Sequence, residues 1–389
     1  HLIAQAGTGT GKTLAYLVPA VLSGRRTVVA TATKALQDQL AHKDLPFLQQ
    51  HLDVPFTATV LKGRSNYLCL QRMDELTGGD TQLDLEGTVE GRISASALEA
   101  LAGWSLETPT GDRADLETEP GDETWAAVSM SAQECPGAAR CPRGGDCFAE
   151  DARHAAAAAD IVVVNSHLYG AHLASGGAVL PDHDVLVVDE AHQLEDVVSD
   201  MCTIDLSGGR FRHLAGRVAT VVADDDLRAD LEGAGDRLSA TLEGHRDRRF
   251  RGDLPDDVVD ALTLGSTRIE RASESLRGID AEVGDVPARR DRALKQAGLL
   301  FAEVAAALEP SAEQVPWVEG RGREPALRVA PLAVDGLLAE GVWEQRVGIL
   351  TSATIPLGLA DRVGLPADRT DDLDAGSPFD FESHALLYC

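Results

Sequence analysis

The chain has 389 residues, which is too long for one average domain and predicts two or three. Apolar residues make up 44% of it and charged residues 25%, and no apolar run reaches the roughly eighteen residues of a membrane-spanning helix, so we expect no membrane partner. The net charge of −28, from 35 basic and 63 acidic residues, argues against wrapping nucleic acid over the whole surface and leaves only a local basic groove open.

The first functional pattern is AGTGTGKT at residues 6–13. Its glycines allow several backbone N–H groups to turn onto one phosphate, and the following LAYLVPAVL predicts a helix whose N-terminus favours an anion. Lys12 would reach the β- and γ-phosphates, and the Thr13 hydroxyl would bind Mg²⁺. The alternative is a Gly- and Thr-rich turn before a core helix. The predicted ATP-binding residues are Ala6, Gly7, Thr8, Gly9, Thr10, Gly11, Lys12 and Thr13.

Short apolar runs rich in Val, Ile and Leu then recur along the chain, at residues 27–33, 160–166, 184–190 and 346–354. Helix-compatible stretches lie between them. This alternation predicts an α/β fold with a parallel sheet buried on both faces. Two long insertions interrupt the pattern, at about 62–150 and 200–335, and the second is nearly all helix-compatible, with Leu and Ala three and four residues apart.

The run VLVVDEAH, residues 185–192, ends a predicted strand in two carboxylates. Ligands of open α/β folds bind at this edge of the sheet. Asp189 would hold Mg²⁺ together with Thr13, and Glu190 would orient or deprotonate the attacking water. An acidic pair in a solvated loop is the alternative when the run is taken alone.

Four of the six cysteines form a pattern of their own. The last three lie in CPGAARCPRGGDC, with five residues in each gap, whereas zinc ligands usually come in pairs two to four residues apart. Four thiolates also suit a [4Fe–4S] cluster, and four unrelated thiols remain the alternative. The four candidate ligands are Cys69, Cys135, Cys141 and Cys147.

The chain resembles the iron–sulphur superfamily 2 DNA helicases of the XPD/DinG type, closest to the bacterial DinG-like branch. It carries, in the family's order, QAGTGTGKT, LKGRSNYLC, the cysteine triplet, DIVVVNSHL, DEAH, LTSAT and GSPFDF. The resemblance implies a RecA-like P-loop motor domain with an inserted iron–sulphur domain and an inserted helical Arch domain. The boundaries that we expect are 1–61, 151–199 and 336–376 for the motor domain, 62–150 for the cluster domain, 200–335 for the Arch and 377–389 for the start of a second motor domain.

The resemblance also implies an activity. ATP hydrolysis with Mg²⁺ would drive 5′→3′ travel along single-stranded DNA and open forked or flapped duplexes, in DNA repair or replication in the cytoplasm. His192 of the DEAH box joins the catalytic set. Thr31, Thr33 and Gln37 would grip the DNA backbone, and Thr351 and Thr354 would couple hydrolysis to movement. Protein partners are not indicated.

Two other interpretations stay open, an iron–sulphur damage sensor that binds DNA without translocation and a P-loop metabolic kinase. Family members also have a segment before the phosphate loop and a complete second motor domain. We therefore expect this chain to be a fragment that is inactive as a helicase by itself. Basic residues that would line a DNA path are Lys62, Arg64, Arg140 and Arg143, whereas the basic stretch 245–252 reads better as a solvated helix end.

Overall fold

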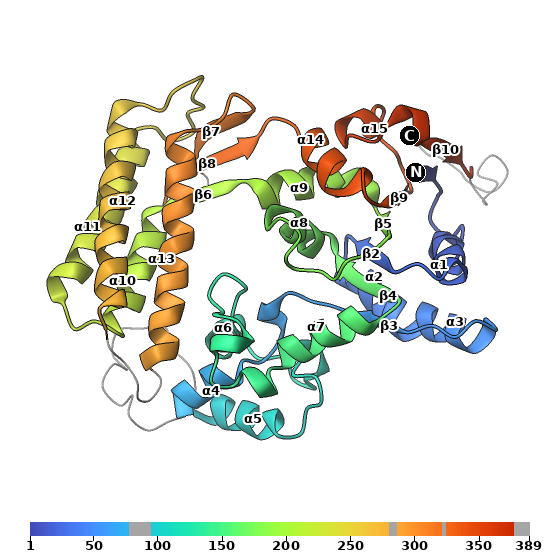
Figure 1. The fold of residues 1–389 in the computed structure, drawn as a ribbon, viewed down its shortest axis with the longest axis horizontal. Helices are drawn as coiled ribbons and strands as arrows, with labels where there is room; N and C mark the ends of the chain where they lie inside the picture. Colours follow the sequence, from blue (N-terminus) through green and yellow to red (C-terminus); the bar gives the residue numbers. More distant parts are fainter. Residues whose placement is uncertain (78–94, 280–285, 321–323, 377–389) are drawn as a thin grey trace, which may run out of the picture. The chain divides into compact units, whose positions relative to one another are not determined.

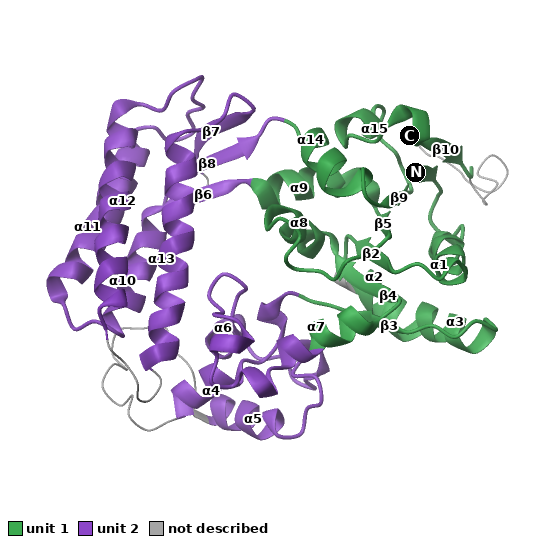
Figure 2. Ribbon diagram, in the orientation of Figure 1, with its two compact units in different colours: residues 1–62, 152–202, 333–389 green, residues 63–151, 203–332 purple. Residues whose placement is uncertain are grey.

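The computed structural model describes residues 1–77, 95–279, 286–320 and 324–376 (Figure 1). The chain divides into two compact units (Figure 2). Unit 1 contains residues 1–62, 152–202 and 333–389, and unit 2 contains residues 63–151 and 203–332. The expected domain boundaries stay predictions, and the expected start of a second motor domain at 377–389 lies outside the described residues.

Unit 1 is built on a seven-stranded parallel sheet, as the apolar runs predicted. The strand order is β10-β1-β9-β5-β2-β4-β3. The strands are β1 (Leu2–Gln5), β2 (Thr27–Thr31), β3 (Ala58–Val60), β4 (Ile161–Asn165), β5 (Val185–Asp189), β9 (Val347–Ser352) and β10 (Asp371–Asp374).

Alternate residues of the central strands enter two different hydrophobic cores. Val29 of β2 and Val187 of β5 belong to one core, whereas Val28 and Leu186 belong to the other. Because successive strand side chains point to opposite faces, this sorting shows that both faces of the sheet are covered. The helices of unit 1 are α1 (Lys12–Ser23), α2 (Lys34–Gln39), α3 (Leu45–His51), α8 (Ser166–Ala174), α9 (Leu194–Cys202), α14 (Asp335–Leu338), α15 (Leu359–Arg362) and the part of α7 (Phe148–Ala158) from residue 152 onward.

Unit 2 has a small core and a large one. The small core packs Leu68, Met73, Leu101, Trp125 and Val128 together. Its helices are α4 (Leu70–Thr77), α5 (Ala95–Ser105) and α6 (Asp122–Val128). The large core lies among four longer helices, α10 (Gly208–Ala219), α11 (Asp225–Glu243), α12 (Asp256–Arg277) and α13 (Val286–Leu308). None of the helices in the described part of the chain is long and apolar enough to cross a membrane.

The second insertion is less uniformly helical than its sequence suggests. A three-stranded antiparallel sheet in the order β6-β8-β7 joins the four helices, with β6 (Ile204–Ser207), β7 (Gln314–Glu319) and β8 (Ala326–Pro331). Leu206, Val318 and Leu327 of these strands are buried in the helical core. The strands are short, and β6 pairs with a segment about 120 residues away, so a local helical periodicity does not reveal them.

Candidate functional site

The phosphate loop lies between β1 and α1. Gly9 and Gly11 have φ values of 78° and 83°, which a side chain would disfavour. Ala6, which stands where the usual pattern has glycine, is not among the positive-φ residues, so its methyl group is tolerated. Thr10 Oγ1 donates a 2.8 Å hydrogen bond to the Gly7 carbonyl and closes the loop on itself. The loop therefore presents its backbone at the start of a twelve-residue helix.

Lys12 and Glu190 meet at the carboxyl edge of the sheet. The Lys12 ammonium lies 3.5 Å from Glu190 Oε1, and 12% of its side chain is exposed. Glu190 has a φ of 59°, a left-handed conformation that is unfavourable for a residue with a side chain. Such backbone strain is typical of functional positions, where the surrounding structure holds the residue in place. The residue directly after β5 is thus turned toward the phosphate loop.

Asp189 is buried at the end of β5, with 2% of its surface exposed. Burial raises the pKa of its carboxyl group, while the nearby charge of Lys12 and the backbone N–H of Glu190 lower it. Tyr16 of α1 donates a 3.2 Å hydrogen bond to Asp189 Oδ2. Burial raises the pKa of Tyr16, and an interaction with the Thr13 side chain lowers it. The two side chains expected to hold Mg²⁺ therefore share one buried tyrosine.

Ser352 connects the end of β9 to the same edge. Its hydroxyl donates to Glu190 Oε2 at 3.2 Å and lies 2.8 Å from His192 Nδ1. His192 Nδ1 is also 3.4 Å from Glu190 Oε2. Glu190, His192 and Ser352 thus form one polar chain that joins β5 to β9.

The residues expected to contact DNA, or to couple hydrolysis to movement along it, differ in how far they are exposed to solvent. Thr31 and Gln37 are buried, and Thr33 is exposed but uses its hydroxyl to cap α2 by accepting from Leu36 N at 3.3 Å. Thr351 is buried beside Asp189 in the β5–β9 register, whereas Thr354 is exposed. Among the described residues, Gln37 Nε2 is a buried donor without a hydrogen-bond partner.

Sequence reasoning missed two residues of this edge, Tyr16 and Ser352. Tyr16 lies in an apolar helical run, where it reads as a core residue, yet its hydroxyl is a polar group that needs a partner when buried. Ser352 stands between the two threonines that the sequence suggested. Its position as the last residue of a strand that ends beside Asp189 is the signal that would have identified it.

The four cysteines of the pattern all lie in unit 2. Burial, and after it the negative charges of the other three, raises the pKa of Cys69 to about 12. Burial first, and then Cys135 and Cys147, raise the pKa of Cys141. Thiols that influence one another in this way lie close together in space, although 66 residues (135 − 69) separate the first two in the sequence.

The loop that carries the last three cysteines is tightly folded. Gly137 has a φ of 89°, and a Cβ on Gly144 would lie 2.1 Å from the Ala138 carbonyl oxygen. Glycine is therefore required where the two turns of the loop meet. On the other side, Cys69 N donates a 2.8 Å hydrogen bond to the Val128 carbonyl, so the backbone already ties this cysteine to the end of α6.

Positive charges surround the thiols. Arg64 interacts electrostatically with Cys135 and Cys147, Arg292 with Cys141, and Lys295 with Cys135. Thiols that interact electrostatically, with cations around them, are compatible with the negative charge of a Cys₄ iron–sulphur cluster. In the described residues, however, no three His, Cys, Asp or Glu side chains are grouped as ligands of a single metal ion.

The basic residues proposed for a DNA path differ in their partners. Arg64 forms an ion pair with Glu150, Arg143 lies 3.3 Å from Asp74, and Arg140 is exposed. In the stretch 245–252, Arg249 makes an antiparallel bridge to Trp317, so the segment extends the small sheet.

Comparison with known proteins agrees with these features. Residues 1–78 match the DEAD/DEAH box helicase family. The chain is 37% identical over 428 residues to "ATP-dependent helicase DinG" of Mycobacterium tuberculosis (strain H37Ra), covering 100% of this chain and 62% of the relative. It is 33% identical over 414 residues to "ATP-dependent DNA helicase YoaA" of Escherichia coli (strain K12), covering 99% of this chain and 62% of that one.

A solved structure called "XPD_Helicase" has the same fold, with a TM-score of 0.51 and 15% identity over 96% of this chain and 58% of that chain. The chain thus spans about three fifths of the length of the relatives that it matches. The first 78 residues thus match the DEAD/DEAH box helicase family, the whole chain is similar in sequence to the helicases named DinG and YoaA, and its fold is that of the XPD structure.

Proposed function

We propose that this chain is the nucleotide-binding motor part of an ATP-dependent DNA helicase that moves 5′→3′ along single-stranded DNA. The observation that carries the proposal is the meeting of Lys12, Asp189 and Glu190 at one edge of the parallel sheet. A phosphate-binding lysine, a buried acid and a strained glutamate are the parts that phosphoryl transfer to water needs.

Each of these residues has a defined task in hydrolysis. Lys12 would leave Glu190 to contact the β- and γ-phosphates, and Thr13 and Asp189 would hold Mg²⁺, which offsets the charge that builds on the γ-phosphate. Glu190, released from the ammonium, would then accept the proton of the attacking water. The remaining loop residues, Ala6 to Gly11, would surround the phosphates with backbone N–H groups.

Ser352 and His192 would report the state of the ATP site to the rest of the motor domain. Both contact Glu190, and Ser352 belongs to the LTSAT segment that also contains Thr351 and Thr354. A change in the position of Glu190 when ATP binds or leaves would therefore pull on β9. The proposed coupling of hydrolysis to DNA movement begins at this hydroxyl.

For DNA contact we propose Thr31, Thr33 and Gln37. The buried, unpartnered amide of Gln37 supports this role, because a phosphate oxygen would satisfy a donor that is costly to leave unpaired. Thr31 is fully buried, and its hydroxyl donates to the Val164 carbonyl at 3.4 Å. Its contribution would therefore be indirect, through the position of the backbone that this hydrogen bond holds. Forked and flapped duplexes, a repair or replication role and a cytoplasmic location follow the family and belong to this proposal.

The second part of the proposal is a [4Fe–4S] cluster held by Cys69, Cys135, Cys141 and Cys147. When bound, the cluster would supply a rigid crosslink between the Cys69 side and the 135–147 loop. Protein purified without oxygen should contain four iron atoms per chain and absorb broadly near 400 nm, as expected of iron–sulphur proteins generally. Stoichiometric zinc without iron, or an unchanged spectrum in Cys141→Ser, would contradict this part.

The helicase proposal itself is tested by ATP hydrolysis in the full-length protein that carries this chain. We expect turnover only when single-stranded DNA is present, and loss of turnover in Lys12→Ala. DNA affinity that is independent of ATP, with no DNA-stimulated turnover, would instead favour a damage sensor, and turnover that ignores DNA would favour a kinase-like enzyme.

A further inference from the structure

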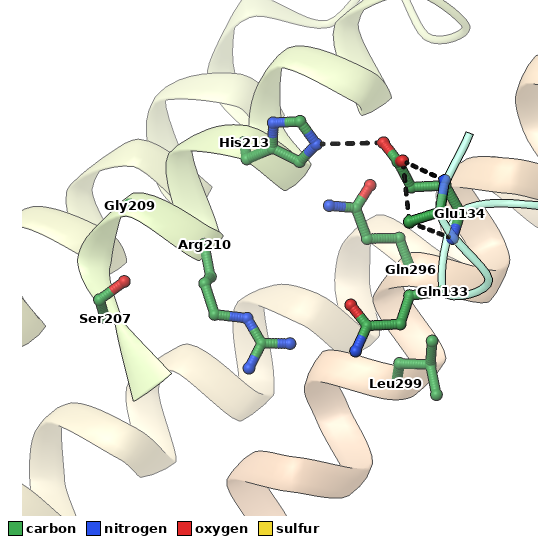
Figure 3. A pocket seen from close by; sticks show the side chains of 9 residues that line it. Gln133, Glu134, Ser207, Gly209, Arg210, His213, Gln296 and Leu299 are labelled. Atoms are coloured by element: carbon green, nitrogen blue, oxygen red, sulfur yellow. Dashed lines mark hydrogen bonds and ion pairs between the residues drawn. The ribbon is translucent and has the colours of Figure 1, made fainter. Parts of the chain in front are cut away.

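Within unit 2, the loop that leads into the cysteine triplet is held by charged side chains of the helical part. Glu134 accepts a 2.7 Å ion-pair contact from Arg217 of α10, and His213 of the same helix lies 3.8 Å away. Figure 3 shows Glu134 facing His213, with Gln296 and Leu299 of α13 along the same pocket of about 290 Å³. Side chains of α10 therefore hold the short loop segment 131–135, and α13 lines the pocket beside it. Both helices lie far from this loop in the sequence.

Lys295, which precedes Gln296 on α13, contacts this loop differently. Its ammonium donates to the Ala132 carbonyl at 2.6 Å and to the Cys135 carbonyl at 2.5 Å. In the described part of the chain it has no carboxylate partner, whereas Arg217 is neutralised by Glu134 and Arg292 by Glu75. Lys295 is thus a half-buried positive charge at a proposed cluster ligand that no acid offsets.

An unpaired charge in such a place costs free energy, because burial disfavours the charged form of lysine. The Lys295 ammonium instead donates to two backbone carbonyls, one of them that of Cys135. The dipoles of these two carbonyls compensate for only part of the free-energy cost of burying the Lys295 charge. A negatively charged group beside Cys135 would remove the rest.

We propose that Lys295 supplies, from the helical insertion, the positive charge that stabilises the reduced state of the iron–sulphur cluster at Cys135. The inference rests on the cluster part of the proposed function. Reduction adds one negative charge to the cluster, and a nearby cation favours the more negative state. Lys295 therefore makes the reduction potential of the cluster depend on contact between α13 and the cysteine loop, so that loosening this contact makes the cluster harder to reduce.

The test is a redox titration of the chain with mediators, followed by electron paramagnetic resonance, in Lys295→Met and in Lys295→Arg, which keeps the charge. We expect the ratio of reduced to oxidised cluster at a fixed potential to fall at least tenfold in Lys295→Met, a shift of about 59 mV for one electron. Lys295→Arg should keep the parental potential. A double variant, Arg217→Met with Glu134→Gln, unties the same loop without changing its net charge and should also leave the potential near the parental value.

A parental reduction potential in Lys295→Met would overturn the inference. An equal shift of the potential in the double variant would also overturn it, because attachment of the loop, and not the charge of Lys295, would then set the potential. If neither Lys295→Met nor Lys295→Gln retains iron while Lys295→Arg does, the role of the charge is supported, and equal iron loss in Lys295→Arg contradicts it. Absence of iron from the parent protein is a different failure, since it removes the proposed cluster itself.

Discussion

Tyr16 offers the sharpest test of the magnesium site, because its hydroxyl lies between the two side chains proposed as ligands. Tyr16→Phe removes the 3.2 Å hydrogen bond to Asp189 and the interaction with the Thr13 side chain without changing the buried ring. A hydrogen bond to a charged group contributes about 1.5–3 kcal/mol. If this energy holds Asp189 in its ligating position, Mg²⁺-dependent nucleotide affinity should fall about tenfold to a hundredfold.

The assay is titration of the chain with a fluorescent ATP analogue, with Mg²⁺ and with chelator. Tyr16→Phe should weaken binding with Mg²⁺ and leave binding in chelator unchanged. Tyr169→Phe is the matched control, since Tyr169 is also buried in unit 1 but its hydroxyl contacts His183 Nε2 at 3.3 Å. An equal loss with and without Mg²⁺, or the same loss in Tyr169→Phe, would refute a positioning role for Tyr16.

Three further predictions concern the ATP site, the packing of unit 2 and a buried histidine. Glu190→Gln in the full-length protein should retain ATP binding and lose hydrolysis, because an amide cannot accept the proton, and parental turnover would contradict the assigned role. Arg292→Met should destabilise unit 2 by about 3 kcal/mol, because it removes the 2.7 Å ion pair of the 9%-exposed Glu75 and leaves the weaker contact to Arg72 at 4.0 Å and the hydrogen bond from Gln71 at 2.9 Å. Tryptophan fluorescence during urea unfolding measures this effect, and Arg292→Met with Glu75→Gln should cost less. His172, which faces His183, Arg346 and Asp182, has its pKa lowered from 6.5 to about 4 by burial. Its neutral form stabilises the fold above pH 6.5, and about 3 kcal/mol of that stability should be lost as the pH falls to about 4. His172→Gln should flatten this dependence, and an unchanged slope would contradict it.

The sheet of unit 1 could be predicted from sequence because its strands are short apolar runs buried on both faces. The strand order could not, since β1 lies beside β9, more than 340 residues later, and no local pattern encodes such a neighbour. The sequence could propose residues 6–13 and Asp189-Glu190 as a nucleotide site because phosphate-binding chemistry requires fixed spacing, and the structure brings Lys12 within 3.5 Å of Glu190. Tyr16 and Ser352 were missed because each depends on where a distant strand ends.

In the cysteine region, too, local sequence patterns do not reveal which residues pack together. Residues 74–130 form an acidic stretch with few regularly spaced apolar residues. In the part of this stretch that the structure describes, Trp125 and Leu101 join Leu68 in a small core, and Trp125 Nε1 donates a 2.7 Å hydrogen bond to the Ser65 carbonyl. Single apolar residues spread over an acidic stretch give no periodic signal, yet they suffice once the chain brings them together. Cys→Ser variants should therefore loosen the 135–147 loop more than this core.

The central proposal, that this chain drives a DNA helicase, is tested most directly by strand separation. The full-length protein is given ATP, Mg²⁺ and partial duplexes with a single-stranded tail at either the 5′ or the 3′ end, beside Lys12→Ala as the inactive control. We predict separation of the 5′-tailed duplex by the parent protein and of neither duplex by Lys12→Ala. Separation of only the 3′-tailed duplex would contradict the proposed direction, and no ATP-dependent separation of either would contradict the helicase function.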